Sequence, residues 1–380
     1  MALQINRMVT LKEAVSKAEL KKFVKFPFTL YKGSAYWIPP IINDELESFD
    51  KTKNPAFENA EARFFLAYKD NAIVGRIAAI INWLEINQQN VKKMRFGWFD
   101  FIDDTEVSET LLKKVAEIGK QNKLEFMEGP VGFSNLDKVG VLTEGFDHIG
   151  TMITWYNHAY YKEHYERLGF VKEKGYLESK FPAKNADPAL FSKVQGLIKR
   201  RYGLREINFT NTKDVLPMAD KMFDLFNETY SSLSSFVPIT DIQKAYFKKR
   251  YLGFINPEYI KFIVDKEDKL IAFAIVMPSF SKALQKANGR LFPFGFLHLL
   301  RAKKTSKDVI FYLIGIHPEF QNKGVTAIIF NEYYKTFTEK KIEMCYRTPE
   351  LEENVAIRQM WKHFDPVVYQ RRCTYRKKLQ

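Results

Sequence analysis

The sequence predicts an α+β fold built of layers around a mixed, mostly antiparallel sheet. Two hairpins carry the antiparallel part: residues 65–78 and 262–275 each read as an apolar strand, a charged turn and a second apolar strand. A strand–helix–strand crossover follows the strand at 309–316, which is apolar on both faces as a central strand is. Antiparallel pairing combined with such a crossover indicates helices layered on one sheet.

The two hairpins also indicate a duplicated unit, because they lie 197 residues apart. Asn157 and Asn354 repeat at the same offset, each at the head of an amphipathic stretch. A fixed period is the signature of repeated structure, although hairpins of this kind are common and chance remains an alternative. We expect domains at 1–182 and 183–380, joined near 181–188, where two prolines interrupt the periodicity.

The elements of the second half follow from its apolar spacing. Strands are expected at 204–210, 259–277 (as a hairpin), 309–316, 342–346 and 367–377, and helices at 216–230, 241–254, 325–337 and 353–363. An insertion at about 278–308 carries seven basic residues around the apolar run LFPFGFLHLL. A loop of that length is typically a lid or binding element, and a helical hairpin is the alternative.

Composition excludes several classes of protein. With 380 residues, 46% of them hydrophobic and 15% aromatic, the chain can bury a large core, which excludes a mostly disordered protein. Two cysteines exclude a disulfide framework and favour a reducing compartment. We find no apolar run long enough for a membrane span, and the six histidines show no ligand spacing for a metal. The expectation is a soluble, cytoplasmic protein without a metal.

Charge is distributed unevenly between the halves. The net charge is +14, yet residues 1–180 hold 25 basic and 25 acidic residues, so the excess lies in the second half. A basic half favours an anionic partner: nucleic acid, anionic lipid or a phosphorylated cofactor. Surface lysines that only keep the protein soluble are the alternative.

The junction after the central strand carries the strongest chemical signal. In IHPEFQNKGVT (316–326) a buried strand stops, a polar turn follows, and a helix begins next to Gly324. The first turn of a helix has unpaired N–H groups and a partial positive charge, which suit a phosphate. Gly324 leaves room for the phosphate and Lys323 adds a cation, although a glycine can also simply close a turn.

This segment resembles the acetyl-CoA-binding loop of the GCN5-related N-acetyltransferases (GNAT superfamily), whose pattern is Arg/Gln-x-x-Gly-x-Gly/Ala. Gln321 and Gly324 match it, and Thr326 departs from it. In the first half, AYKDNAIVGRIAAI resembles the family's second and third strands and YYKEHYERLGF its C-terminal segment. The chain thus resembles proteins with two tandem GNAT-like units.

The resemblance implies which half binds acyl-CoA. In the first half the strand 96–102 runs into Asp103, Asp104 and Glu106, whose carboxylates would repel a diphosphate, so 1–182 is expected to be degenerate. In the second half the implied acyl-CoA contacts, including the pantetheine-pairing strand edge and the asparagine that begins the last major helix, are Leu313, Ile314, Gly315, Ile316, Gln321, Asn322, Lys323, Gly324, Val325, Thr326 and Asn354. Asn354 could equally be a plain helix cap.

The catalytic groups are less clear, because two usual ones are missing. The resemblance places a glutamate base at the position of Tyr312 and a tyrosine acid at that of Trp361. Glu343 is then the candidate base, and Tyr346 or Tyr369 the candidate acid. The alternatives are that Glu343 is a solvated strand residue and that both tyrosines belong to the core. His317 is expected to cap the loop, and Cys345 to be a small buried side chain.

The resulting hypothesis is a CoA-dependent N-acyltransferase that moves an acyl group, most simply acetyl, to a primary amine of a small molecule or peptide. A non-catalytic acyl-CoA binder or regulatory pseudoenzyme is the first alternative, because the usual base and acid are missing. A nucleic-acid-associated protein is the second, motivated by RRCTYRKK (371–378) and the basic insertion. The run LFPFGFLHLL could line an acyl chain or contact a membrane surface.

Overall fold

The chain folds into two compact units, which a computed structural model describes for residues 8–231 and 236–379. Unit 1 comprises residues 8–176, 284–293 and 370–379, and unit 2 comprises 177–231, 236–283 and 294–369. The units are not consecutive in the sequence, because each takes a strand from the other half of the chain. The predicted boundary between 182 and 183 stays a prediction.

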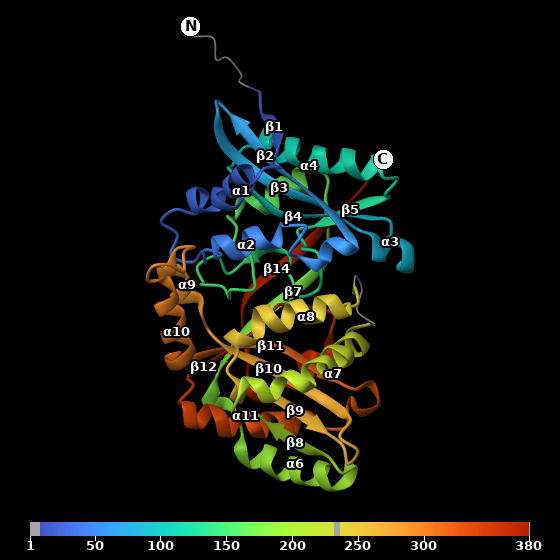
Figure 1. Cartoon of the computed structure of the whole chain (residues 1–380), viewed down its shortest axis with the longest axis vertical. Helices are drawn as coiled ribbons and strands as arrows, with labels where there is room; N and C mark the ends of the chain where they lie inside the picture. Colours follow the sequence, from blue (N-terminus) through green and yellow to red (C-terminus); the bar gives the residue numbers. More distant parts are fainter. Residues whose placement is uncertain (1–7, 232–235, 380) are drawn as a thin grey trace. The chain divides into compact units, whose positions relative to one another are not determined.

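Unit 1 contains a mixed sheet in the strand order β1-β2-β3-β4-β5-β14, with β6 also paired to β14. Its strands are β1 Thr10–Glu13, β2 Ala60–Lys69, β3 Ala72–Asn82, β4 Lys93–Phe101, β5 Phe126–Gly129 and β6 Val141–Glu144. Its helices are α1 Lys17–Leu30, α2 Ile42–Ser48, α3 Trp83–Gln89, α4 Thr105–Gln121 and α5 Tyr160–Arg167 (Figure 1). Among the described strands of unit 1, β4 and β5 are the only parallel pair, so the unit is mostly antiparallel.

Unit 2 repeats this plan in the order β7-β12-β11-β10-β9-β8, again with one parallel pair, β11–β12. The strands are β8 Arg205–Asn208, β9 Ile260–Val264, β10 Leu270–Pro278, β11 Asp308–Ile316 and β12 Met344–Arg347. The helices are α6 Pro188–Tyr202, α7 Thr212–Tyr230, α8 Asp241–Tyr251, α10 Gly295–Thr305, α11 Thr326–Lys340 and α12 Val355–Trp361. The predicted α+β class with mixed, mostly antiparallel sheets is confirmed.

Two long strands connect the units covalently: β7 Val171–Pro182 and β14 Val367–Lys378. In unit 2 the end of β7 pairs with β12, with Phe181 opposite Cys345. In unit 1 the end of β14 pairs with β5, with Tyr375 opposite Gly129. Each unit is therefore completed by a strand that lies beyond the sequence of its own repeat. The remaining elements are α9 Ser281–Ala287 and the short β13 Glu350–Leu351.

The cores follow from the period-2 alternation of the strands. In β2, Phe64 packs into a cluster with α1 and α2, whereas the next residue, Phe65, packs into a cluster with α4 and α5. Unit 2 has a corresponding cluster in which α6, α11 and α12 cover the sheet, with Trp361 and Phe311 inside it. The insertion contains α9 and α10, so it has helices of its own rather than being an unstructured lid.

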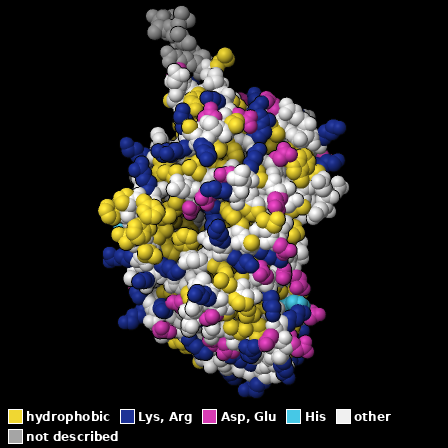
Figure 2. Space-filling model, in the orientation of Figure 1, with side chains coloured by type: hydrophobic (Ala, Val, Ile, Leu, Met, Phe, Trp, Pro, Cys, Tyr) yellow, Lys and Arg dark blue, Asp and Glu magenta, His cyan; other side chains and the backbone are white. Residues whose placement is uncertain are grey.

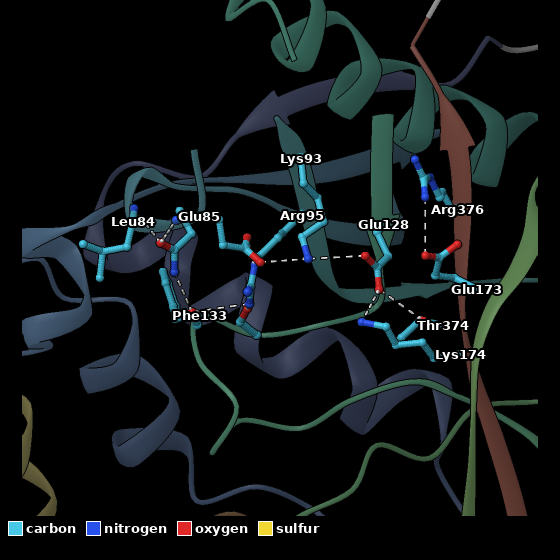
Figure 3. A network of polar contacts seen from close by, with 12 residues as sticks. Leu84, Glu85, Lys93, Arg95, Glu128, Phe133, Glu173, Lys174, Thr374 and Arg376 are labelled. Atoms are coloured by element: carbon cyan, nitrogen blue, oxygen red, sulfur yellow. Dashed lines mark hydrogen bonds and ion pairs between the residues drawn. The ribbon is translucent and has the colours of Figure 1, made fainter. Parts of the chain in front are cut away.

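A buried ionic network joins four elements of unit 1 (Figure 3). Glu85 of α3 accepts from Arg95 at 2.7 Å and forms an ion pair with Lys93 at 2.8 Å, and Lys93 also lies 3.3 Å from Glu128 of β5. The hydroxyl of Thr374 on β14 donates to Glu128 at 3.3 Å. Burial opposes the charge, yet Arg95 and Lys93 hold the pKa of Glu85 below its ordinary value. The network thereby connects the incoming strand β14 to the unit that it completes.

Candidate functional site

The central strand of unit 2 extends beyond its parallel neighbour. β11 and β12 pair from Asp308 opposite Met344 to Phe311 opposite Arg347, where β12 ends. β11 continues to Ile316, so 313–316 have no strand on the β12 side within the described residues. On the other side a bulge at Tyr312 shifts the register against β10. Beyond Phe311, β11 therefore separates from β12, and its residues 313–316 are half-buried or buried.

The loop that follows β11 presents main-chain amides without partners. A 3₁₀ turn, Pro318–Phe320, leads to α11, whose N-cap residue Val325 offers no side-chain acceptor. Among the described residues, the N–H groups of Asn322, Gly324, Val325 and Thr326 have no acceptor. Unpaired amides at the positive end of a helix form an anion site. The structure thus brings together the predicted residues of 321–326.

Gly324 is required by the backbone of this loop. Its φ is +77°, and a Cβ there would lie 3.2 Å from Cδ1 of Ile198 on α6. Lys323 lies above the rings of Tyr202 and Phe320, 5.5 and 5.2 Å from their centroids. These contacts hold the loop against α6, a helix that the sequence analysis did not predict. Both the backbone conformation and the packing therefore favour glycine at this position.

The C-terminal end of α7 contributes side chains that the sequence analysis missed. The hydroxyl of Tyr230 donates to the carbonyl of Ile314 at 3.0 Å, and that of Thr229 to the carbonyl of Ile316 at 3.4 Å. Burial raises the pKa of Tyr230 to about 12, so this hydroxyl stays protonated at neutral pH. The sequence predicted the helix itself, but it held no signal that connects its end to β11.

A carboxylate and a histidine meet at the same end of β11. Glu228 of α7 lies 3.4 Å from Nε2 of His317, and Nζ of Lys269 lies 3.1 Å from the same nitrogen. Nδ1 of His317 accepts from the N–H of Glu319 at 3.4 Å, so His317 caps the 3₁₀ turn as expected. The Glu228 side chain is half exposed, which leaves it accessible to a substrate.

Glu343 lies away from this cluster. It is exposed and directly precedes β12, so in the parallel pair it lies at the end of β11 opposite to the loop. From the level of Asp308 to Ile316 a strand of eight steps spans roughly 26 Å. The structure therefore does not bring Glu343 together with Gly324, and its catalytic role is unsupported by the geometry.

Tyr346 and Tyr369 lie together near the point where β11 and β12 separate. Tyr346 pairs with Ile310, one residue before the strands separate, and its ring meets that of Tyr369 edge-on at 5.7 Å. Nζ of Lys180 lies 5.3 Å from the Tyr369 ring. Burial, with a contribution from Asp308, raises the pKa of Tyr346. Because it pairs with Ile310, Tyr346 lies six strand residues, roughly 20 Å, from Ile316, and the structure does not bring it together with the loop.

Three further residues from the sequence analysis lie in contacts that stabilise the fold: Asn354, Trp361 and Cys345. Oδ1 of Asn354 accepts from the N–H of Ile357 at 3.1 Å, which makes it the N-cap of α12. Trp361 is buried, with its ring 4.8 Å from that of Phe311. Burial raises the pKa of the Cys345 thiol, so it is a poor nucleophile.

In unit 1, side chains occupy the two corresponding positions, the start of α4 and the end of β4. The carboxylate of Asp104 accepts from the N–H of Glu106 at 2.9 Å and pairs with Lys69 at 2.8 Å, so it caps α4. At the end of β4 the N–H of Phe101 donates to the hydroxyl of Tyr161 at 3.1 Å. A carboxylate therefore caps the start of α4, whereas the N-cap residue of α11, Val325, offers no side-chain acceptor.

Two other features, a metal cluster and a membrane-spanning helix, are not found among the described residues. Within 8–231 and 236–379, no cluster of three or more His, Cys, Asp or Glu side chains could hold a metal ion. In the same ranges, no helix is long and apolar enough to cross a bilayer.

Comparisons with known proteins place the sequence and the fold among relatives. No protein-family model matches the chain. It is 26% identical to protein YghO of Escherichia coli (strain K12), over 99% of this chain and 98% of that protein. It is 24% identical to the bacterial ceramide synthase of Caulobacter vibrioides (strain NA1000 / CB15N), over 80% of this chain and 79% of that protein.

Solved structures resemble the whole chain. A tandem GNAT protein from the clavulanic acid biosynthesis pathway covers 98% of this chain and 99% of its own, with a TM-score of 0.57 at 9% identity. A GCN5-related N-acetyltransferase from Sphaerobacter thermophilus covers 98% and 96%, with a TM-score of 0.50 at 9% identity. The chain therefore has the fold of the tandem GCN5-related N-acetyltransferases over nearly its entire length.

Proposed function

We propose that unit 2 binds an acyl-CoA and that the protein is a CoA-dependent N-acyltransferase acting on a primary amine. One observation carries this proposal: among the described residues, the edge of β11 at 313–316 has no neighbouring strand, and four amides within 322–326 of the same segment have no acceptor. The amides would hold the diphosphate. The carbonyls of Ile314 and Ile316 on the strand edge already accept from Tyr230 and Thr229, so the pantetheine arm would pair with main-chain N–H groups of this edge. Asn354 caps α12 and has no role in this proposal.

The reaction would proceed by direct transfer. The neutral amine attacks the thioester carbon, the C–N bond forms, the C–S bond breaks, and a main-chain N–H near Ile316 donates to the developing oxyanion. One such donor contributes on the order of 10²–10³ in rate. The proton of the amine would pass to Glu228, and the thiolate would take a proton from the hydroxyl of Tyr230, which lies at Ile314. Tyr346 lies at the level of Ile310, roughly 20 Å along the strand from Ile316, so it and its neighbour Tyr369 have no part in this step.

The identity of the donor and acceptor is proposed more broadly. Acetyl-CoA is the simplest donor, and the insertion with its apolar run is compatible with a longer chain. A ceramide is an amide, so the relative named bacterial ceramide synthase supports N-acylation of an amine. That relative also favours testing long-chain amines among the acceptors.

The nucleic-acid alternative loses support in unit 1. The basic run at 371–378 forms β14, where Arg371 pairs with Glu144 at 3.1 Å and Arg376 with Glu173 at 3.4 Å. Arg372 is buried and donates to the carbonyl of Trp155 at 3.0 Å. These cations are compensated within the protein and are not collected on an open face.

The test is titration calorimetry with acetyl-CoA and longer acyl-CoAs, followed by a thiol-release assay over a panel of amines. We expect binding to one site per chain and turnover with at least one amine. Glu228→Gln should lower kcat on the order of 10²–10⁴-fold and leave acyl-CoA affinity unchanged. Binding without turnover of any amine would favour the pseudoenzyme, and absence of binding would refute the proposal.

A further inference from the structure

Helix α10 presents large apolar side chains to solvent. Phe294, Leu297 and Leu300 are 68%, 49% and 52% exposed, whereas Gly295 and Leu299 of the same segment are buried. Figure 2 shows hydrophobic side chains gathered at the left edge of the molecule, where Figure 1 labels α9 and α10. Contiguous exposed apolar side chains mark an interaction surface.

Cations lie on the same exposed face of α10. Leu297, Leu300, Arg301 and Lys304 follow the spacing i, i+3, i+4, i+7, which places them on one side of the helix. Arg301 and Lys304 are both exposed. From 279 to 307 the sequence has seven Lys or Arg and no Asp or Glu. We name Phe294, Leu297, Leu300, Arg301 and Lys304 the α10 surface.

A second exposed segment of unit 2 lies against the C-terminal half of α10. Nζ of Lys303 donates to the carbonyl of Gly253 at 2.6 Å, and the side chain of Asn256 donates to the carbonyl of Lys303 at 3.0 Å. These bonds connect α10 to the end of α8, where Tyr251 and Phe254 are 45% and 41% exposed. The apolar exposure is therefore not confined to one helix.

We propose that the α10 surface docks unit 2 on an anionic phospholipid bilayer. Phe294, Leu297 and Leu300 would enter the boundary between headgroups and acyl chains, while Arg301 and Lys304 remain at the level of the phosphates. The charge complementarity selects this occupant, because a cationic segment free of carboxylates beside protruding apolar side chains suits a surface that is anionic outside and apolar beneath. Nucleic acid would match the cations but not the protruding Phe294 and Leu297.

The experiment is co-sedimentation of the full chain with vesicles of phosphatidylcholine alone or mixed with phosphatidylglycerol. We expect binding to the mixed vesicles, weak or no binding to neutral ones, and loss of binding as NaCl rises. Arg301→Gln with Lys304→Gln should weaken binding by about fivefold per charge. Phe294→Ser with Leu297→Ser and Leu300→Ser should weaken it by on the order of tenfold or more.

Matched variants on α7 provide the controls. Lys213→Gln with Lys221→Gln removes two exposed charges, and Leu216→Ser removes an apolar side chain that is 43% exposed. Both should bind vesicles like the wild type. Equal binding to neutral vesicles, unchanged binding by the α10 variants, or binding of a homopolymer RNA but not of vesicles would overturn the proposal. Gly324→Glu should still sediment with vesicles, since the α10 surface shares no residue with the 317–326 loop.

Discussion

The two units have the same strand order, but the helix that follows the central strand begins differently in each unit. Within the part of unit 2 that the structure describes, four amides at and before the start of α11 have no acceptor, whereas in unit 1 the start of α4 is capped by Asp104. The buried charges differ as well: unit 1 compensates Glu85 with two cations, whereas unit 2 buries Lys261 with incomplete pairing. Unit 1 thus caps the start of its helix with a carboxylate, whereas no side chain caps the start of α11 in unit 2 among the described residues.

The largest effect is expected from introducing a carboxylate into the loop of unit 2. Gly324→Glu should weaken acyl-CoA binding more than about a thousandfold, which equals about 4 kcal/mol, because the new charge opposes the diphosphate. Calorimetry measures the loss. Gly324→Ala is the matched control, since it has the same unfavourable φ of +77° without the charge. If Gly324→Glu bound like the wild type, the diphosphate would lie elsewhere.

The buried network of unit 1 provides the next comparison. Glu85→Ala should lower the free energy of unfolding by about 3–5 kcal/mol, because Lys93 and Arg95 lose their shared carboxylate while remaining buried. Urea unfolding measures it. Glu117→Ala, which removes an exposed partner of Lys114, should cost at most about 1 kcal/mol. Similar losses in the two variants would show that the network does not stabilise unit 1.

Lys261 of β9 predicts a pH dependence located in unit 2. Burial, opposed in part by Glu332, lowers its pKa from 10.5 to about 8, and its Nζ donates to Asn208 at 2.8 Å. Between pH 8 and 10.5 the unfolded chain binds the extra proton, so the free energy of unfolding should rise with pH by about 3 kcal/mol.

Lys261→Met should remove that rise, whereas Lys213→Met, at an exposed position, should keep it. Urea unfolding at several pH values measures both variants. If the difference in unfolding free energy between the wild type and Lys261→Met did not change between pH 8 and 10.5, the pKa of Lys261 would be the same in the folded and the unfolded chain.

The smallest effect on stability is expected from removing the N-cap side chain of α4 in unit 1. Asp104→Ala should cost about 1 kcal/mol of unfolding free energy, the usual value of an N-cap side chain. It should not create a second acyl-CoA site, because Tyr161 still closes the end of β4. A stoichiometry of two acyl-CoA per chain in this variant would show that Asp104 alone separates the two units.

Local signals in the sequence predicted much of unit 2. The apolar runs gave β9, β10 and β11, and Gly324 with its polar neighbours gave the loop, because each depends on neighbouring residues only. Helix α6 was missed since Pro188 was interpreted as a break, whereas Asp187 caps the helix and Pro188 is its first residue. The strands β7 and β14 could not be assigned to units, because their partners are distant in sequence.

The sequence predicted the candidate site only where the site is made of residues that are adjacent in the chain. The amides of 322–326 follow from a strand, a turn and a helix in succession. The positions of Glu228 and Tyr230 beside β11 depend on how α7 packs, which no local pattern specifies. Glu343 was selected for its strand, but the register of β12 against β11 places it at the far end. The predictions failed where they depended on helix packing and strand register, which residue type alone does not specify.

Native mass spectrometry of the gently purified protein tests the central claim most directly. The account predicts one CoA thioester per chain, retained by Asp104→Ala and lost from Gly324→Glu, with the mass of the adduct giving the acyl group. A chain that carries no CoA and takes up none when acyl-CoA is added, or a Gly324→Glu variant that retains it, would contradict the account.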